Sequence, residues 1–269
     1  MSTATRLIAA VILGASPVAA QSYTFVPNLV YGTYTGGAQN LLLDLYLPLS
    51  GPVPRPVIVW IHGGAWLAGS RFPVPSNVTA FCTQGYAVAS IDYRLSGTAI
   101  WPAQIQDCRG AVRWLRANAA QYGLDPDRIG AWGSSAGGHL AALLGTSGGV
   151  ASVTIGSATV DLEGATGGNL GLSSRVHSVV DWFGPTDFLA MRDFPGFDHE
   201  GPNSPESLLL GGAIQTVPAL AASANPITYL TPDDPPMLIL HGTVDTTVPF
   251  NHNAGHFAVP GRGSRCLQG

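Results

Sequence analysis

The chain has 269 residues, of which 46% are hydrophobic, and a formal net charge of −4. This length and composition allow one substantial buried core. Acidic and basic residues are scattered along the chain. The sequence contains no lysine, so all 12 residues counted as Lys or Arg are arginines. The charge pattern argues against nucleic acid as a partner, and the lack of lysine excludes P-loop phosphate binding and lysine-activated nucleophiles.

The first 20 residues have the layout of a secretory signal peptide. Arg6 precedes an apolar run over residues 7–13, and small residues follow up to Val-Ala-Ala at 18–20. We therefore expect residues 1–20 to be a leader and residues 21–269 to form a single domain that is secreted or periplasmic. No later stretch approaches the roughly 18 apolar residues of a membrane span, which predicts a soluble mature protein.

Alternating strand and helix patterns follow in chain order. Residues 41–47 alternate as an early strand, whereas 57–61, 87–91, 176–182 and 237–240 are short apolar runs typical of parallel strands buried on both faces. Residues 103–120 have apolar positions at the spacing of an amphipathic helix. The order predicts an α/β fold with a mostly parallel sheet covered by helices on both faces. Residues 151–174 and 192–206 are rich in Gly, Ser and Pro, and we expect them to be loops over the functional edge.

The three cysteines, Cys82, Cys108 and Cys266, have neither metal-ligand nor redox-motif spacing. Two interpretations stay open at this point. Cys82 and Cys108 could form a disulfide bond after export, or they could be ordinary buried thiols.

A Gly-Ser-Ser-Ala-Gly string at residues 133–137 stands between a predicted strand over 128–132 and a predicted helix over 136–144. Gly-x-Ser-x-Gly in this context is typical of a nucleophile elbow, whose turn leaves no room for side chains two residues before and after the serine. The N-terminus of the following helix also favours negative charge at the site. The string alone could be an ordinary turn, but its context predicts Ser135 as a nucleophile.

A His-Gly-Gly-Ala-Trp string at residues 62–66 follows the predicted strand over 57–61. Acyl transfer needs backbone N–H donors directed at the oxygen of a tetrahedral intermediate, and glycines allow the backbone to come close. We expect Gly63 and Gly64 to supply donors, together with Ala136, which follows the nucleophile. The alternative is an ordinary turn at the end of a strand, with His62 structural.

Asp245 comes just after the predicted strand over 237–240, in the chain order of nucleophile and then acid. Its predicted role is to accept a hydrogen bond from an imidazole and to stabilise the imidazolium. Asp187, after the strand over 176–182, is the competing acid, although a helix N-cap is the plainer interpretation there.

The catalytic base is harder to assign. His256, 11 residues after Asp245, is the first candidate, and His252 is the second. A parallel crossover takes a dozen or more residues, and the 24 residues after Asp245 show no periodic apolar segment. We therefore expect no final helix, strand and helix in this tail.

The remaining histidines have structural interpretations. His139 lies one helical turn after Ser135 and is predicted to pack or join a polar network. His62 and His241 are expected to brace loops, and His177 to lie in a strand. The neighbours Asp198, His199 and Glu200 could hold a metal, but a solvated surface is the preferred interpretation, and no metal or cofactor is expected.

Several motifs taken together resemble the bifunctional feruloyl and acetyl esterase-like (BD-FAE-like) branch of the α/β hydrolases, related to the hormone-sensitive lipase group. The matching segments are residues 62–66, 91–96, 101–109, 125–129, 133–140 and 241–245, with Val-Pro at 248–249. The resemblance implies a cofactor-free carboxylester hydrolase acting on acetyl or other short acyl groups, for instance on plant polysaccharide side chains. It also implies Ser135 and Asp245 as nucleophile and acid, and Gly63, Gly64 and Ala136 as oxyanion donors.

The tail departs from the pattern of that branch, whose members continue with a helix, a strand and a Gly-His loop. We expect its C-terminal elements to be truncated or altered, with a frame change near Asn251 as the hypothesis. Three functions remain open: an active esterase with Ser135, Asp245 and His256, a serine peptidase or amidase on the same scaffold, and an impaired relative that binds without turnover.

Overall fold

The computed structural model describes residues 22–34, 38–193, 196–250 and 265–268. Its strands are β1 (Tyr23–Tyr34), β2 (Gln39–Pro48), β3 (Arg55–Ile61), β4 (Ala87–Ile91), β5 (Leu124–Ser134), β6 (Ser152–Ile155), β7 (Ala158–Asp161), β8 (Ser178–Trp182), β9 (Met237–His241) and β10 (Arg265–Gln268). Its helices are α1 (Ser76–Thr79), α2 (Ala103–Ala117), α3 (Ala119–Tyr122), α4 (Ala136–Thr146), α5 (Pro205–Leu210) and α6 (Pro218–Ala224). Short 3-10 turns are η1 (Ala80–Gln84), η2 (Phe188–Asp193), η3 (Ile214–Thr216) and η4 (Pro226–Tyr229).

Eight strands form one sheet in the order β1-β2-β4-β3-β5-β8-β9-β10. The pairs β1–β2 and β2–β4 are antiparallel, and every later pair is parallel. The predicted α/β fold with a mostly parallel sheet is therefore confirmed. The carboxyl ends of β3, β5, β8 and β9 meet at one edge, because Ile61 pairs with Gly133, and Trp182 pairs with both Ser134 and Leu240.

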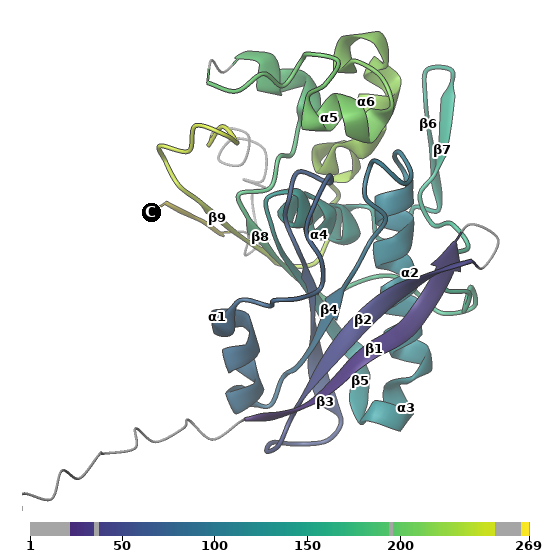
Figure 1. Ribbon diagram of the computed structural model, residues 1–269, viewed down its shortest axis with the longest axis vertical. Helices are drawn as coiled ribbons and strands as arrows, with labels where there is room; N and C mark the ends of the chain where they lie inside the picture. Colours follow the sequence, from purple (N-terminus) through teal and green to yellow (C-terminus); the bar gives the residue numbers. More distant parts are fainter. Residues whose placement is uncertain (1–21, 35–37, 194–195, 251–264, 269) are drawn as a thin grey trace, which may run out of the picture.

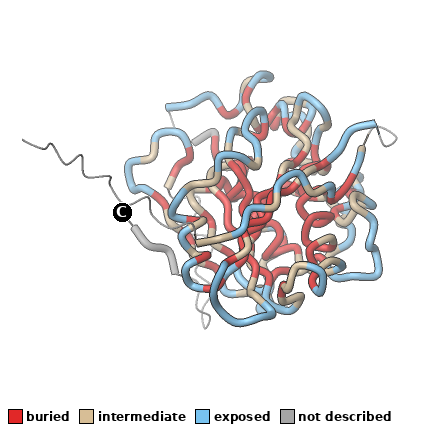
Figure 2. Tube along the Cα trace, turned by 60° about the horizontal axis from the view of Figure 1, so that its bottom comes forward, coloured by how far each residue is buried: buried red, intermediate tan, exposed pale blue. Residues whose placement is uncertain are grey.

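Two apolar layers cover the two faces of the sheet. In β3, Val59 and Ile61 belong to the larger cluster with α2 and α4, whereas Trp60 belongs to a smaller cluster with the α1–η1 segment. This alternation is what a strand buried on both faces requires. Figure 1 shows α2 and α4 on one side of the sheet and α1 on the other. In Figure 2 the buried residues lie at the centre of the fold.

Several elements differ from the sequence prediction. The segment over residues 151–174 is not loop throughout, because it contains the antiparallel hairpin β6–β7. A further strand exists in the tail, since β10 pairs in parallel with β9, with Arg265 opposite Leu238. The expectation that a final helix, strand and helix do not fit after Asp245 was wrong for the strand, because four residues of backbone pairing need no apolar periodicity. The N-terminal strand β1 was not predicted.

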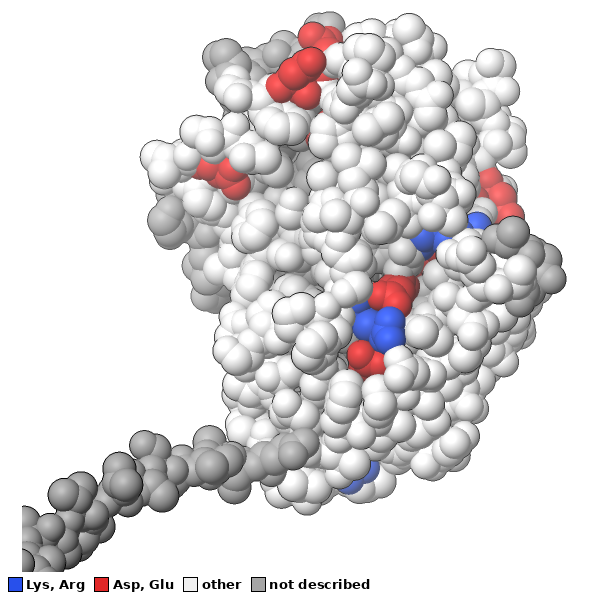
Figure 3. Space-filling model, viewed as in Figure 1, with Lys and Arg blue, Asp and Glu red and all other residues white. Residues whose placement is uncertain are grey.

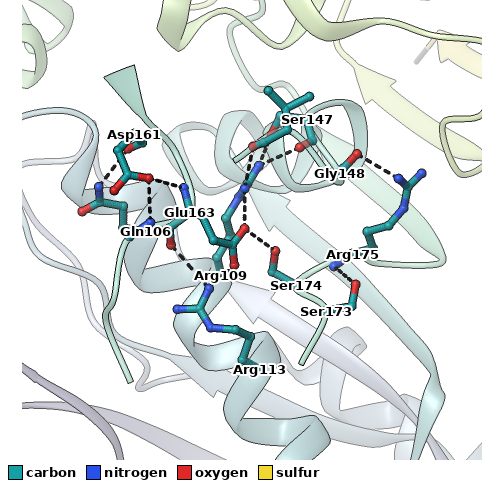
Figure 4. A network of polar contacts seen from close by, with 12 residues as sticks. Gln106, Arg109, Arg113, Ser147, Gly148, Asp161, Glu163, Ser173, Ser174 and Arg175 are labelled. Atoms are coloured by element: carbon teal, nitrogen blue, oxygen red, sulfur yellow. Dashed lines mark hydrogen bonds and ion pairs between the residues drawn. The ribbon is translucent and has the colours of Figure 1, made fainter. Parts of the chain in front are cut away.

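A network of buried arginines ties the segment after α4 to α2 (Figure 4). The guanidinium of Arg109 lies 2.6 Å from one carboxylate oxygen of Glu163, and that of Arg113 contacts the other. Arg109 also donates to the carbonyl of Ser147 at 2.7 Å. Arg109 and Arg113 are about 1% and 0% exposed, so the single carboxylate compensates two buried cations.

The two cysteines with described side chains are free thiols. Cys82 and Cys108 are both fully buried but belong to the two clusters on opposite faces of the sheet. Of the two open interpretations, buried thiols is therefore the correct one, and the structure does not contain the bridge between them. Burial raises the pKa of Cys82 to about 11.

The surface carries few charged side chains, as the low charge content of the sequence leads one to expect. Figure 3 shows few charged side chains on the face drawn, with acids and bases next to one another at its centre. None of the helices within the described ranges is long and apolar enough to cross a bilayer. The predicted leader over residues 1–20 lies outside the described residues.

Candidate active site

Ser135 sits between two regular elements, since β5 ends at Ser134 and α4 begins at Ala136. Its φ of 53° lies in the left-handed region that non-glycine residues rarely adopt. Two backbone hydrogen bonds hold it there: its N–H donates to the carbonyl of Trp182 at 2.8 Å, and its carbonyl accepts from the N–H of His139 at 3.0 Å. This is the strained strand-to-helix turn that the sequence motif predicts.

The glycines of the motif are required by backbone contacts. A Cβ on Gly133 would lie 2.1 Å from the carbonyl oxygen of Gly137. A Cβ on Gly137 would lie 2.1 Å from the carbonyl oxygen of Ile61 at the end of β3. The obstacle is thus neighbouring backbone rather than the serine side chain, and the turn packs directly against the strand that carries the His-Gly-Gly loop.

The His-Gly-Gly loop approaches the nucleophile closely. A Cβ on Gly63 would stand 3.3 Å from the Cβ of Ser135. Gly64 has a φ of +115°, and its carbonyl accepts hydrogen bonds from the N–H groups of Leu67 and Ala68 at 3.0 Å. The structure therefore brings the predicted oxyanion residues Gly63 and Ala136 together around Ser135, with Gly64 next to them.

Trp66 anchors this loop in the core. It is 2% exposed, has a φ of 57°, and packs edge-on against His139 and Phe188 at centroid distances of 5.2 and 5.4 Å. Its carbonyl accepts a hydrogen bond from the N–H of Ser96 at 2.8 Å. The buried indole therefore fixes the conformation of the loop that carries Gly63 and Gly64.

Asp245 lies on the same edge of the sheet, beyond β9. Its Oδ1 accepts the N–H groups of Thr247 and Val248 at 2.8 and 3.0 Å, so the carboxylate organises its own turn. Its Oδ2 lies 3.6 Å from Nε2 of His241, beyond hydrogen-bond length. The side chain is 22% exposed. Its position after the carboxyl end of β9 is the place predicted for the acid.

The competing Asp187 is engaged in local structure. Its Oδ1 accepts from the N–H of Leu189 at 3.1 Å and from the side-chain amide of Asn225 at 2.8 Å. These contacts stabilise the start of η2 and join it to the segment after α6, which favours the capping interpretation.

The two predicted bases, His256 and His252, lie outside the described residues. His139 is fully buried in α4 and its Nε2 donates to the carbonyl of Ala224 at 2.7 Å. Burial lowers the pKa of His139 to about 4, so it stays neutral. Its contacts are those of a packing residue rather than of a base for the neighbouring serine.

His62 and His241 brace loops, as the sequence predicts. His62 Nδ1 donates to the carbonyl of Gly63 at 2.8 Å, and its ring stacks on Tyr93 at 4.4 Å. His241 Nε2 donates to the carbonyl of Val248 at 2.7 Å and so closes the turn that holds Asp245. Burial is the largest effect on both and lowers their pKa values.

His177 and His199 differ from expectation. His177 precedes β8, which begins at Ser178, and its Nδ1 contacts the backbone N–H of Ile129 at 3.2 Å. His199 does not lie on a solvated surface, since it is 4% exposed and contacts Glu206. Asp198 and Glu200 are exposed, and the part of the chain that the structure describes holds no group of three or more metal-ligating side chains.

Asp181 is a residue near the site that the sequence prediction missed. It lies in β8, is fully buried, and accepts the N–H of Gly184 at 2.8 Å through Oδ1. A Cβ on Gly138 would lie 2.3 Å from that oxygen, so the carboxyl group backs the first turn of α4. Burial raises the pKa of Asp181 to about 7. Its only signal in the sequence was an acid inside an otherwise apolar run.

Comparison with known proteins agrees with this geometry. The family model BD-FAE matches residues 43–256. Esterase LipC of Mycobacterium tuberculosis is 32% identical over 222 residues, 77% of this chain and 49% of LipC, and Esterase LipQ of the same organism is 31% identical over 82% of this chain and 49% of LipQ. The chain thus spans about half the length of these curated relatives.

Solved structures show the same fold. A truncated form of a carbohydrate esterase from gut microbiota has a TM-score of 0.81 and 36% identity, covering 93% of this chain and 88% of that one. Esterase 2 of Thermogutta terrifontis, in its propionate-bound structure, has a TM-score of 0.66 and 25% identity over 90% of this chain and 82% of its own. The match to the family model covers more than half of the sequence. The chain therefore belongs to the BD-FAE family, on the α/β-hydrolase fold of carboxylic ester hydrolases.

Proposed function

We propose that this protein is a secreted or periplasmic serine carboxylesterase that hydrolyses short-chain acyl esters, of the acetyl or feruloyl type, through an acyl-enzyme. The observation that carries the proposal is the backbone of Ser135, strained at φ 53° on a strand-to-helix turn, with the Gly63 backbone directly against it. The esterase names of its relatives support the same chemistry. Residues 21–269 form the proposed catalytic domain.

In this proposal the Ser135 hydroxyl attacks the ester carbonyl while an imidazole takes its proton. The proposed base is His256, which lies within the range matched by the family model. Asp245 fixes the tautomer of that imidazole and stabilises the imidazolium, which then protonates the leaving alcohol. Water attacks the acyl-enzyme by the same route and releases the carboxylic acid.

The charge of the tetrahedral intermediate falls on the former carbonyl oxygen. Backbone N–H groups of Gly63, Gly64 and Ala136 are the proposed donors. Ala136 opens α4, and the first N–H groups of a helix have no partner inside the helix and carry the positive end of its dipole. Removing one such donor typically costs about 100- to 1,000-fold in kcat. No cofactor enters the proposed mechanism.

The substrate class rests on the relatives. Two similar structures are those of a carbohydrate esterase from gut microbiota and of a bifunctional GH43-CE protein of Bacteroides eggerthii, the latter with a TM-score of 0.77 and 42% identity. An ester carried on a polysaccharide is therefore the proposed natural substrate. Residues 1–20, with the layout of a leader, support export.

The proposal is tested by hydrolysis of p-nitrophenyl acetate by residues 21–269 beside Ser135→Ala, Asp245→Asn and His256→Ala. We expect wild-type turnover, loss of activity to background in the serine variant, and losses of about 1,000-fold or more in the other two. Circular dichroism of each variant controls for folding. A folded wild-type protein with no activity, or a Ser135→Ala variant that retains it, would refute the proposal.

A second assay separates the acyl and leaving groups. Acetyl, butyryl and feruloyl esters are compared with the corresponding anilides at equal concentration. Faster hydrolysis of the esters supports an esterase, whereas comparable rates on anilides would assign the site to a peptidase or amidase.

A further inference from the structure

His199 and Glu206 form a buried pair beside the loop that carries Asp245. Nδ1 of His199 lies 3.0 Å from Oε1 of Glu206, and the two side chains are 3% and 4% exposed. Glu206 stands in the first turn of α5. The pair is therefore shielded from solvent and is built from two elements that the sequence separates.

The other nitrogen of the His199 ring contacts the loop over residues 242–250 that carries Asp245, called the acid loop below. Nε2 of His199 lies 2.9 Å from the carbonyl oxygen of Thr247. The N–H of the same Thr247 donates to Oδ1 of Asp245 at 2.8 Å. Thr247 thus contacts both Asp245, through its N–H, and His199, through its carbonyl. The His199 ring in turn contacts Glu206, so it links the acid loop to α5.

Both contacts of the ring require a hydrogen on nitrogen. A carbonyl oxygen only accepts, so Nε2 must donate to Thr247, and an ionised Glu206 only accepts, so Nδ1 must donate as well. A neutral imidazole carries one N–H and satisfies only one of the two contacts. With the hydrogen on Nδ1 facing the carboxylate, the lone pair of Nε2 would face the Thr247 carbonyl, and the tether would be lost.

We propose that His199 is a positioning residue for the acid loop: paired with Glu206, it holds the Thr247 carbonyl and thereby the Asp245 carboxylate, and it releases them when the pair loses its proton. This inference rests on the proposed role of Asp245 as the catalytic acid. Asp198, the neighbour of His199, is the other charged group that acts on it.

The electrostatics give the direction of the pH response. Burial lowers the pKa of His199, but the hydrogen bond and charge of Glu206, the Thr247 carbonyl and the charge of Asp198 outweigh it, so the pKa is raised above 6.5. A raised pKa means that the tether is complete at lower pH and is lost as the pH rises through the pKa of the folded protein. The expected signature is an alkaline decline in activity that depends on His199.

The test compares kcat and KM for p-nitrophenyl acetate from pH 6 to 9.5 in wild type, His199→Gln and Glu206→Gln. In wild type we expect kcat to decline on the alkaline side. His199→Gln should lack that decline and have a lower kcat at pH 7, by up to roughly 100-fold for a misplaced catalytic group, with KM little changed. Glu206→Gln keeps the ring but offers an amide N–H that can donate to Nδ1, so a neutral ring keeps its Nε2–H on Thr247 and the alkaline decline should disappear. His177→Gln, whose ring also contacts backbone, is the matched control and should follow wild type.

A second measurement does not depend on activity. Hydrogen exchange followed by mass spectrometry reports the protection of the peptide covering residues 242–250. At pH 7, exchange there should be faster in His199→Gln than in wild type and unchanged in His177→Gln. If the wild-type enzyme shows no Ser135-dependent turnover, the proposed esterase fails while the exchange result still decides the tether. An alkaline decline that persists in His199→Gln, or equal exchange in the two proteins, would overturn the inference.

Discussion

The buried carboxyl group of Asp181 should make the stability of the protein depend on pH. In the folded chain its pKa is about 7, and the unfolded value is 3.8. Between these values the unfolded chain releases the proton while the folded chain retains it, so stability falls as the pH rises through that window. At about 1.4 kcal/mol per pKa unit the full effect is about 4 kcal/mol. Between pH 5 and pH 8 it amounts to about 3 kcal/mol.

The substitution Asp181→Asn removes this ionisation and keeps an oxygen that can accept the N–H of Gly184. The free energy of unfolding of the variant should therefore rise relative to that of wild type by about 3 kcal/mol between pH 5 and 8, whatever the difference between the two proteins at pH 5. Urea unfolding followed by tryptophan fluorescence at four pH values measures this. Asp127→Asn, at an exposed carboxylate, controls for the loss of one acidic group. A wild-type minus variant difference that stays constant within about 1 kcal/mol would refute the reasoning.

Three further changes have defined outcomes. Glu163→Ala leaves two buried arginines without their carboxylate. It should lower the free energy of unfolding by about 3 kcal/mol, because removing one partner of a buried pair costs about 3–5 kcal/mol and Glu163 is 28% exposed. Thermal unfolding should show a Tm lower by about 6–12 °C, and an unchanged Tm would contradict the network. Gly137→Ala places a Cβ against backbone oxygen and should abolish turnover, whereas Gly97→Ala, at a position with open space, should not; equal activities would contradict the geometry of the turn. Cys82 and Cys108 should react with iodoacetamide only after unfolding, as read by mass spectrometry, and recovery of either in a disulfide peptide would show the assignment as free thiols to be wrong.

The sequence predicted well where a local rule determines the geometry. The strand over 87–91, the helix starting at residue 136 and the turn at Ser135 follow from apolar runs and from glycines that no other residue can replace. The loop carrying Gly63 and the placement of Asp245 beyond β9 follow from the order of strands in a parallel sheet. These features depend on neighbours in sequence or on the meeting of strand ends.

Polar contacts between residues far apart in the chain could not be predicted from the sequence. The Gly/Pro-rich loop around His199 predicts a solvated surface, and nothing in the local pattern shows that the ring contacts Glu206 and the Thr247 carbonyl in the interior. The pairing of β10 with β9 is likewise a backbone contact between segments with no shared periodicity. Asp181 was overlooked because its partners, Gly184 and the first turn of α4, come together only in the fold.

The most direct test of the account is covalent labelling by a fluorophosphonate, which reacts only with an activated serine. Purified residues 21–269 are treated with the probe, digested, and the adduct is located by mass spectrometry. The account predicts a single adduct on Ser135, and strongly reduced labelling in Asp245→Asn. A folded protein that is not labelled, or an adduct on another serine, would contradict the assignment of Ser135 as the nucleophile.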